Sequence, residues 1–131
     1  MPQAHSEAPL TQAIGYRDGD ALFEGYAVIP QPAAAKRPCV VLTHEWSGLN
    51  EGMKRLAERY AGLGYICFAF DVYGKGVRGD LVGDNAHLMD PLLSDRALLR
   101  RRLLAGFETA TQVPGVDATR MAVVGYCFGG L

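Results

Sequence analysis

The sequence predicts an α/β fold in which helices connect the strands of a mostly parallel sheet. Three short apolar runs, at residues 40–43, 66–70 and 121–125, show the near-continuous hydrophobicity of strands buried on both faces. Segments with apolar residues at helical spacing lie between these runs. Because alternating strands and helices build parallel sheets, this order predicts part of an open α/β sheet.

The composition fits one globular domain, which we expect to span residues 1–131. Of the 131 residues, 49% are hydrophobic and 21% are charged, and the formal net charge is −1. A balance this close to neutral argues against a nucleic-acid partner. No apolar run approaches the ~18 residues that cross a bilayer, and the first residues lack the basic and apolar regions of a signal peptide. We therefore expect a cytoplasmic protein without a membrane partner.

The first predicted element is a β-hairpin. Residues 11–16 and 22–29 have strand character, and residues 17–20 between them contain Asp18-Gly19, a strong signal for a tight turn. The following residues, 30–38, contain three prolines and a run of alanines, and they predict a connector that leads into the strand at 40–43.

Two helices are predicted after this strand. The first begins after Asn50, a good N-cap, and ends at Gly64, which can adopt a left-handed conformation. The second lies between Pro91 and Val113, with Asp90 or Ser94 as alternative starting points. The long Gly- and Asp-rich stretch from residue 71 to 90 is predicted to be a loop, and loops of this length in compact domains are often functional.

The cysteine pattern argues against disulfides and zinc. Cys39, Cys67 and Cys127 are odd in number, far apart and without a Cys-x-x-Cys pair, so we expect free thiols. The acidic residues of the long loop do not have the spacing of a calcium site, and no metal is predicted.

The sequence around Cys127 has the pattern of a nucleophile turn. A nucleophile on a sharp strand-to-helix turn needs small residues two positions before and after it, and Gly125 and Gly129 meet this requirement. In such a turn the next backbone N–H, here that of Phe128, points at the developing oxyanion. A thiol at a helix N-terminus also has a lowered pKa, which favours the reactive thiolate. The alternative is that Cys127 is a small apolar residue at the end of a strand.

Gly-Tyr-Cys-Phe-Gly-Gly at residues 125–130 resembles the nucleophile motif of dienelactone hydrolases, the carboxymethylenebutenolidase-like cysteine branch of the α/β hydrolases. A second match is Thr-His-Glu-Trp-Ser-Gly at residues 43–48, which resembles the loop after the third strand in that family. The resemblance implies that Glu45 lies close to the nucleophile. It also implies that the Trp46 N–H completes the oxyanion hole.

A third match is Asp-Val-Tyr-Gly-Lys at residues 71–75, since the family continues after its next strand with Asp-x-Tyr and a basic residue that pairs with the substrate carboxylate. The resemblance thus implies a substrate site formed by Tyr73 and Lys75. Lys75 stands where the family carries Arg, and Arg78 is the alternative for this role. The implied activity is hydrolysis of a small, anionic ester or lactone through a thioester, without a cofactor.

In α/β hydrolases the acid and the histidine of the triad follow the nucleophile, so we expect them beyond residue 131 and expect the chain to be the N-terminal part of the domain. His44 is the upstream histidine best placed to replace the missing base. Since Glu45 competes for the position next to the nucleophile, we expect His44 to hydrogen-bond locally and shape its loop instead.

Two motif matches and one alternative function remain. Residues 74–79 satisfy the dinucleotide-binding pattern Gly-x-Gly-x-x-Gly, but they do not open a helix. His44-Glu45 begins like the zinc motif His-Glu-x-x-His, but the second histidine is absent.

The alternative to the hydrolase is a non-catalytic binding module on a truncated scaffold. Its exposed sheet edge would favour an oligomer.

Overall fold

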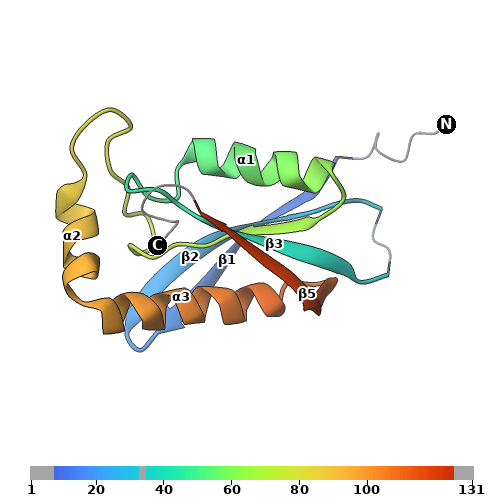
Figure 1. The fold of residues 1–131 in the computed structure, drawn as a ribbon. Coiled ribbons are helices and arrows are strands. Elements are labelled where there is room, and N and C mark those ends of the chain that lie inside the picture. Colours follow the sequence, from blue (N-terminus) through green and yellow to red (C-terminus); the bar gives the residue numbers. More distant parts are fainter. Residues whose placement is uncertain (1–7, 33–34, 126–131) are drawn as a thin grey trace.

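The computed structural model describes residues 8–32 and 35–125, which form a five-stranded sheet with helices on both faces (Figure 1). The strand order is β1-β2-β4-β3-β5. Helix α1 covers one face and α3 the other, with α2 at one end of α3. The elements in chain order are β1 (Leu10–Asp18), β2 (Ala21–Ile29), β3 (Arg37–Thr43), α1 (Glu51–Gly62), β4 (Ile66–Ala69), α2 (Ala86–Ser94), α3 (Arg96–Thr111) and β5 (Val116–Gly125).

The predicted hairpin is confirmed, with longer strands and a shorter turn. β1 and β2 pair antiparallel from Leu10 opposite Ile29 to Asp18 opposite Ala21. Two residues therefore make the turn, and the first of them, Gly19, has a φ of +60°. Glycine adopts this backbone conformation without the steric cost that other residues meet.

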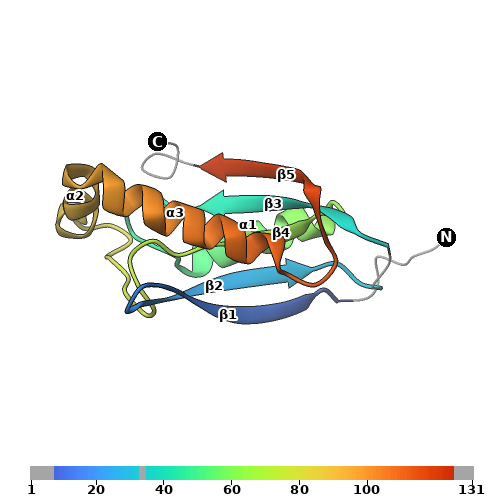
Figure 2. The same cartoon turned by 90° about the horizontal axis from the view of Figure 1, so that it is seen from below.

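The three apolar runs form the predicted parallel strands. β3 lies between β4 and β5 and pairs parallel with both, while β2 joins the sheet antiparallel to β4 (Figure 2). Parallel pairing brings the carboxyl ends of these three strands to the same edge of the sheet. All four residues of β4 are buried, which explains its unbroken hydrophobicity.

Alternate residues of the central strands enter two different cores. In β3, Val40 and Leu42 face α1, whereas Cys39 and Val41 face α3. The α1-side core is completed by buried residues of the helix that recur at helical spacing, Met53, Ala57 and Ala61. The larger α3-side core is dominated by aromatic and aliphatic side chains, among them Tyr16, Phe23, Phe68, Phe70 and Leu99.

Both predicted ends of α1 are confirmed. The side chain of Asn50 accepts a hydrogen bond from the Met53 N–H at 3.0 Å, which satisfies one of the otherwise unpaired amides of the first turn. After the last helical residue the chain reverses through Gly64, whose φ is +99°. This is the left-handed geometry that often ends a helix.

The prediction for residues 71–113 is wrong in one respect, because two helices occupy this stretch instead of one. α2 spans Ala86–Ser94 and contains Pro91, a residue that normally interrupts a helix by removing a backbone donor. α3 then begins after Asp95, whose carboxylate accepts from the Leu98 N–H at 3.0 Å. No helix in the described part of the chain is long and apolar enough to cross a membrane.

α3 approaches the sheet most closely at Gly106. A Cβ atom at this position would overlap a ring carbon of Phe70. Glycine here lets the helix backbone rest directly on the aromatic ring that follows β4.

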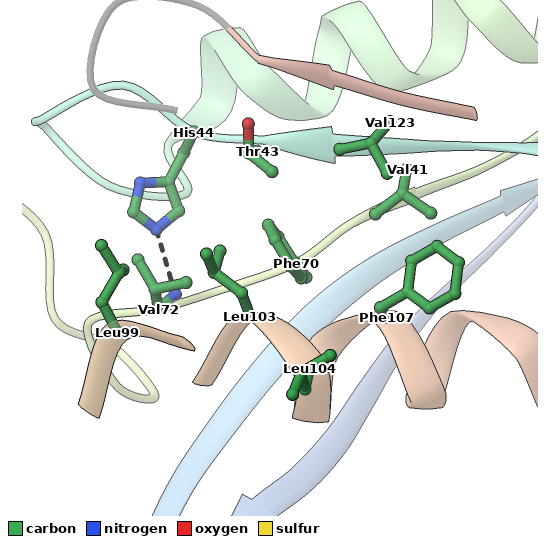
Figure 3. A pocket seen from close by; sticks show the side chains of 10 residues that line it. All are labelled: Val41, Thr43, His44, Phe70, Val72, Leu99, Leu103, Leu104, Phe107 and Val123. Atoms are coloured by element: carbon green, nitrogen blue, oxygen red, sulfur yellow. Dashed lines mark hydrogen bonds between the residues drawn. The ribbon is translucent and has the colours of Figure 1, made fainter. Parts of the chain in front are cut away.

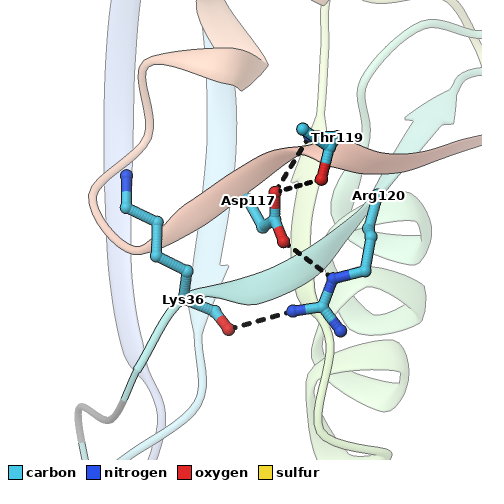
Figure 4. Close-up of polar contacts among 4 residues, drawn as sticks. All are labelled: Lys36, Asp117, Thr119 and Arg120. Carbon is cyan, nitrogen blue, oxygen red and sulfur yellow. Dashed lines mark hydrogen bonds and ion pairs between the residues drawn. The ribbon is translucent and has the colours of Figure 1, made fainter.

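The beginning of β5 is irregular and is held by Asp117. Its carboxylate accepts hydrogen bonds from the backbone and hydroxyl of Thr119 and from Arg120, and these bonds lower the pKa of Asp117 to about 2 (Figure 4). Arg120 also donates to the carbonyl oxygen of Lys36 at 3.2 Å. The register between β3 and β5 shifts in this region, and regular pairing resumes at Met121, where the sequence predicts the strand to begin.

Candidate active site

The loops that leave one edge of the sheet carry the predicted site residues. β3 ends at Thr43, β4 at Ala69 and β5 at Gly125, and Thr43 is the register partner of Gly125. Residues 44–50 follow β3, and residues 70–85 follow β4. Since ligands of open α/β sheets bind beyond the carboxyl ends of the strands, this edge is the candidate active site.

Hydrogen bonds tie the loop after β3 to the loop after β4, among them one from the Gly79 N–H to the carbonyl oxygen of Ser47 at 2.8 Å. The N–H of Val72 donates to Nε2 of His44 at 3.1 Å. The hydroxyl of Tyr73 donates to the carbonyl oxygen of Trp46 at 2.8 Å, across 27 residues of sequence. The rings of His44 and Tyr73 also pack together, with centroids 4.8 Å apart. The structure therefore brings together two of the predicted site residues, Trp46 and Tyr73.

The hydrogen bonds of His44 define its protonation. Nδ1 lies 2.8 Å from the carbonyl oxygen of Glu45, and because this oxygen can only accept, Nδ1 carries the proton. Nε2 is then the acceptor for Val72. The side chain is 1% exposed, and this burial lowers the pKa of His44, so the ring is neutral at pH 7. The expected local hydrogen bonding of His44 is confirmed, and both nitrogens are engaged in it.

The carboxylate of Glu45 turns toward the start of α1. Oε1 accepts from the Ser47 N–H at 3.3 Å, from the Asn50 amide at 3.4 Å and from the Ser47 hydroxyl in a short contact. Asn50 therefore makes two contacts, since its Nδ2 donates to Glu45 while its Oδ1 caps α1. The negative charge of Glu45 adds to the effect of burial in raising the pKa of Tyr73, which keeps that hydroxyl protonated as a donor.

Asp71 organises the first turn of the loop after β4. Its Oδ1 accepts from the backbone N–H groups of Tyr73 and Gly74 at 2.9 and 3.1 Å, and its Oδ2 accepts from the Glu24 N–H at 3.3 Å. The Tyr16 hydroxyl satisfies the main chain of the same residue, accepting from the Asp71 N–H at 2.9 Å and donating to its carbonyl oxygen at 2.6 Å. Asp71 is fully buried, so these contacts hold the loop that presents Tyr73.

Arg102 supports the same loop and was not among the predicted site residues. Its Nη1 donates to the carbonyl oxygen of Val72 at 2.7 Å, and its guanidinium lies 5.0 Å from the ring centre of Phe23. In the sequence Arg102 directly follows Arg100 and Arg101, and no motif distinguishes it from them. Its spacing could have indicated this role, because Arg102 comes three residues after Leu99 and one before Leu103. This spacing places it at the border of the apolar face of α3.

The two candidate cations for a substrate anion lie in different surroundings. Lys75 is exposed and its Nζ lies 3.7 Å from a carboxylate oxygen of Glu24, on the hairpin. Arg78 is half-buried and approaches Gly48, where an added Cβ would lie 3.6 Å from its Cδ. The charge of Arg78 also contributes to lowering the pKa of His44. Arg78, not Lys75, therefore faces the loop after β3.

An apolar cavity of about 260 Å³ lies between the sheet and α3, next to this site (Figure 3). Thr43 and His44 are the polar residues of its lining, and Figure 3 shows the hydrogen bond from Val72 to the imidazole at its border. Trp46 packs half-buried against the α3-side core. The remaining lining residues are Val41, Phe70, Val72, Leu99, Leu103, Leu104, Phe107 and Val123.

The two described cysteines are unsuited to nucleophilic chemistry. Cys39 and Cys67 are free and buried, as expected, and burial raises the pKa of both, that of Cys39 to about 12. The predicted nucleophile Cys127 and the predicted donor Phe128 lie outside the described residues. Within residues 8–32 and 35–125, no group of three or more His, Cys, Asp or Glu side chains could hold a metal ion.

The fold and the site together define a class of protein. An antiparallel hairpin leads into parallel strands with crossover helices, and the site residues follow the carboxyl ends of β3 and β4. This arrangement is the N-terminal portion of the α/β-hydrolase fold.

Comparison with known proteins identifies the family. The model of the dienelactone hydrolase family matches residues 23–131, and the chain belongs to this family. A protein of Aquifex aeolicus named "Putative carboxymethylenebutenolidase" is 27% identical over 125 residues, which cover 92% of this chain and 52% of that protein.

Solved structures give the same result. The structure named m3DLH is 37% identical with a TM-score of 0.88, and it is matched over 95% of this chain and 52% of its own. A dienelactone hydrolase-like promiscuous phosphotriesterase from metagenomic libraries is 31% identical with a TM-score of 0.87 and the same coverage. The chain therefore spans about half the length of the relatives it matches.

Proposed function

We propose that the whole protein is a cysteine hydrolase that opens a small ester or lactone through a thioester intermediate. The observation that carries the proposal is the register of β3 and β5, in which Thr43 is paired with Gly125. Glu45 follows Thr43 by two residues, and Cys127 follows Gly125 by two residues. Because β3 and β5 are parallel and in register, we expect the side chains of Glu45 and Cys127 to lie close together beyond the edge of the sheet. The loops after β3 and β4 are hydrogen-bonded to each other at the same edge.

In the proposed reaction the Cys127 sulfur attacks the carbonyl carbon of the substrate, and a sulfur–carbon bond forms. The carbon–oxygen bond of the ester then breaks, and the alcohol leaves with the proton that the thiol gave up. Water cleaves the thioester and restores the thiol. The N–H groups of Phe128 and Trp46 stabilise the negative charge on the carbonyl oxygen in both steps. The acid and the histidine of the triad follow the nucleophile in the chain order of α/β hydrolases.

Glu45 is the proposed first acceptor of the thiol proton. The donors from Ser47 and Asn50 converge on Oε1, which fixes the plane of the carboxylate. Oε2 is then the atom that takes the proton from Cys127, because a base must lie within hydrogen-bond distance of the group it deprotonates. Ionisation of the thiol produces the thiolate that attacks the substrate.

Arg78 is the proposed partner of an anionic group on the substrate. It is half-buried beside Gly48, and a guanidinium can bind a carboxylate through two parallel hydrogen bonds. Lys75 is exposed and paired with Glu24, so its charge is already partly balanced. A substrate with a carboxylate near the scissile bond fits this arrangement.

The proposal is tested in the full-length protein with Cys127→Ala, assayed on a nitrophenyl ester and on a carboxylate-bearing lactone. We expect loss of turnover by about 10³-fold or more, and Cys39→Ala serves as the matched control that removes a buried thiol. Mass spectrometry should find the acyl group of a slow ester on Cys127. Esterase activity that survives Cys127→Ala would refute the cysteine mechanism.

A further inference from the structure

We propose that His44 is a positioning residue for the oxyanion hole: its Nδ1–H fixes the peptide plane between Glu45 and Trp46 and thereby holds the Trp46 N–H toward the substrate. This inference rests on the proposed function, in which the Trp46 N–H is one of the two oxyanion donors. The juxtaposition that carries it is the 2.8 Å hydrogen bond between Nδ1 of His44 and the carbonyl oxygen of Glu45.

The planarity of the peptide bond connects this hydrogen bond to the oxyanion donor. The Glu45 carbonyl oxygen and the Trp46 N–H belong to one peptide unit, which is planar and trans, so the two groups point in opposite directions. A bond that fixes the direction of the oxygen therefore also fixes the direction of the N–H. A peptide in a loop lacks the regular hydrogen bonds of a helix or sheet that would otherwise set its plane.

The imidazole itself is held so that it cannot turn. Its second nitrogen, Nε2, accepts from the Val72 N–H at 3.1 Å, and the carbonyl oxygen of Val72 is bound by Arg102 at 2.7 Å. The ring packs against Tyr73 and is 1% exposed. The orientation of the Glu45–Trp46 peptide is thus set by a chain of contacts that ends on α3.

The Trp46 N–H is suited to donate to a ligand atom. Within residues 8–32 and 35–125, no group accepts a hydrogen bond from it, although Trp46 is only half exposed. An N–H that is kept in a fixed direction and has no acceptor among the described residues is suited to a ligand atom. The bond from His44 also polarises the peptide and strengthens the N–H as a donor.

This role predicts a specific kinetic effect. The charge on the substrate oxygen develops in the transition state, so misalignment of one donor lowers kcat and leaves KM nearly unchanged. Removal of a donor costs about 10²- to 10³-fold, and a rotated peptide plane should cost less, about 10- to 100-fold. A general-base role for His44 would instead require a nitrogen that is not committed to the protein main chain.

Two substitutions separate the two nitrogens of the ring in the full-length protein. The amide of Asn reaches the position of Nδ1, so His44→Asn keeps a donor for Glu45 and loses the acceptor for Val72. The amide of Gln reaches the position of Nε2, so His44→Gln does the reverse. We expect kcat to fall about threefold in His44→Asn and about 30-fold in His44→Gln, with KM within about twofold. His87→Gln, an exposed change on α2, is the control that leaves kcat unchanged.

A spectroscopic measurement reports on the oxyanion hole directly. Hydrogen bonds to a carbonyl oxygen lower its infrared stretching frequency, so the thioester carbonyl of a slowly deacylating ester should shift upward in His44→Gln and much less in His44→Asn. Equal kinetic losses and equal frequencies in the two folded variants would overturn the inference, because a packing role does not distinguish the nitrogens.

The wild-type protein provides a test that needs no variant. The ¹⁵N chemical shifts of the His44 ring should show a neutral imidazole protonated on Nδ1, and a proton on Nε2 would overturn the inference even if both variants fail to fold. Failure of the proposed function has a different signature, since esterase activity would then survive Cys127→Ala. Loss of activity in Cys127→Ala together with wild-type kinetics in His44→Gln would refute the positioning role alone.

Discussion

Replacement of Tyr16 by phenylalanine tests how strongly the loop after β4 is held. The Tyr16 hydroxyl bridges the N–H and the carbonyl oxygen of Asp71, at 2.9 and 2.6 Å. Both residues are buried, and burial is the main cause of the raised pKa of Tyr16, so the hydroxyl remains a donor at any ordinary pH. Tyr16→Phe removes one oxygen atom and leaves two main-chain groups without this partner.

The cost follows from those two groups. A buried donor or acceptor that loses its partner costs about 1–3 kcal/mol, and two of them give about 2–4 kcal/mol after some relaxation of the loop. The ring contacts should persist, because Tyr16 stacks on Phe23 with centroids 5.5 Å apart and also touches Phe68. The expected loss therefore reflects the hydrogen bonds and not a cavity.

The free energy of unfolding is measured by urea denaturation, followed by circular dichroism, for wild type, Tyr16→Phe and Tyr65→Phe. Tyr65 is 38% exposed and is the matched control, for which we expect a change below about 0.5 kcal/mol. If Tyr16→Phe is as stable as this control, then the bridge to Asp71 does not stabilise the loop, and the argument from buried main-chain groups is wrong.

Three further predictions concern packing, pH and substrate charge. Gly106→Ala should lower the free energy of unfolding by about 1–3 kcal/mol through the clash beneath α3, whereas Gly62→Ala, with open space around its Cβ, should raise it by about 0.5–1 kcal/mol in the same denaturation assay. Burial lowers the pKa of His44 below 6.5, so below that pH the unfolded chain binds a proton that the folded chain does not. The free energy of unfolding should therefore fall by up to ~1.4 kcal/mol per pH unit as the pH is lowered below 6.5. Denaturation of His44→Asn at a series of pH values should show a weaker dependence of this free energy on pH. Arg78→Ala should raise KM for a carboxylate-bearing lactone about tenfold but not for its neutral methyl ester, while Lys75→Ala should leave both within about twofold; the reverse order would assign the anion site to the lysine.

The sequence predicts the strands and α1 correctly because local patterns determine them. The run at residues 40–43 must be buried on both faces, and Asn50 and Gly64 define the ends of α1 by their own conformational preferences. α2 is missed because Pro91 argues against a helix on local grounds. In the structure Leu92, the residue after it, is buried in the α3-side core, and tertiary packing of this kind overrides the local preference.

In the candidate site, too, the sequence predicts the residues that belong to local motifs but not those whose contacts depend on tertiary structure. Glu45 and Tyr73 belong to motifs that can be read along the chain, whereas the supporting contacts of Arg102 and Asn85 are made across loops. The side chain of Asn85 is fully buried and exchanges two hydrogen bonds with the main chain of Asp80, at 2.8 and 2.7 Å, instead of capping α2. No periodicity indicates such a contact, since it depends on how the loop returns on itself.

The hydrogen bonds between the loops after β3 and β4 can form only after both loops have been synthesised. Val72 comes 28 residues after His44 along the chain. At about 5–20 residues per second, the ribosome takes roughly 1.4–6 s to add them, while a hairpin such as β1–β2 closes in microseconds. For those seconds the loop that bears Glu45 lacks its hydrogen bonds to the loop after β4. The contacts of the candidate site therefore form only after β4 and the loop that follows it have been made.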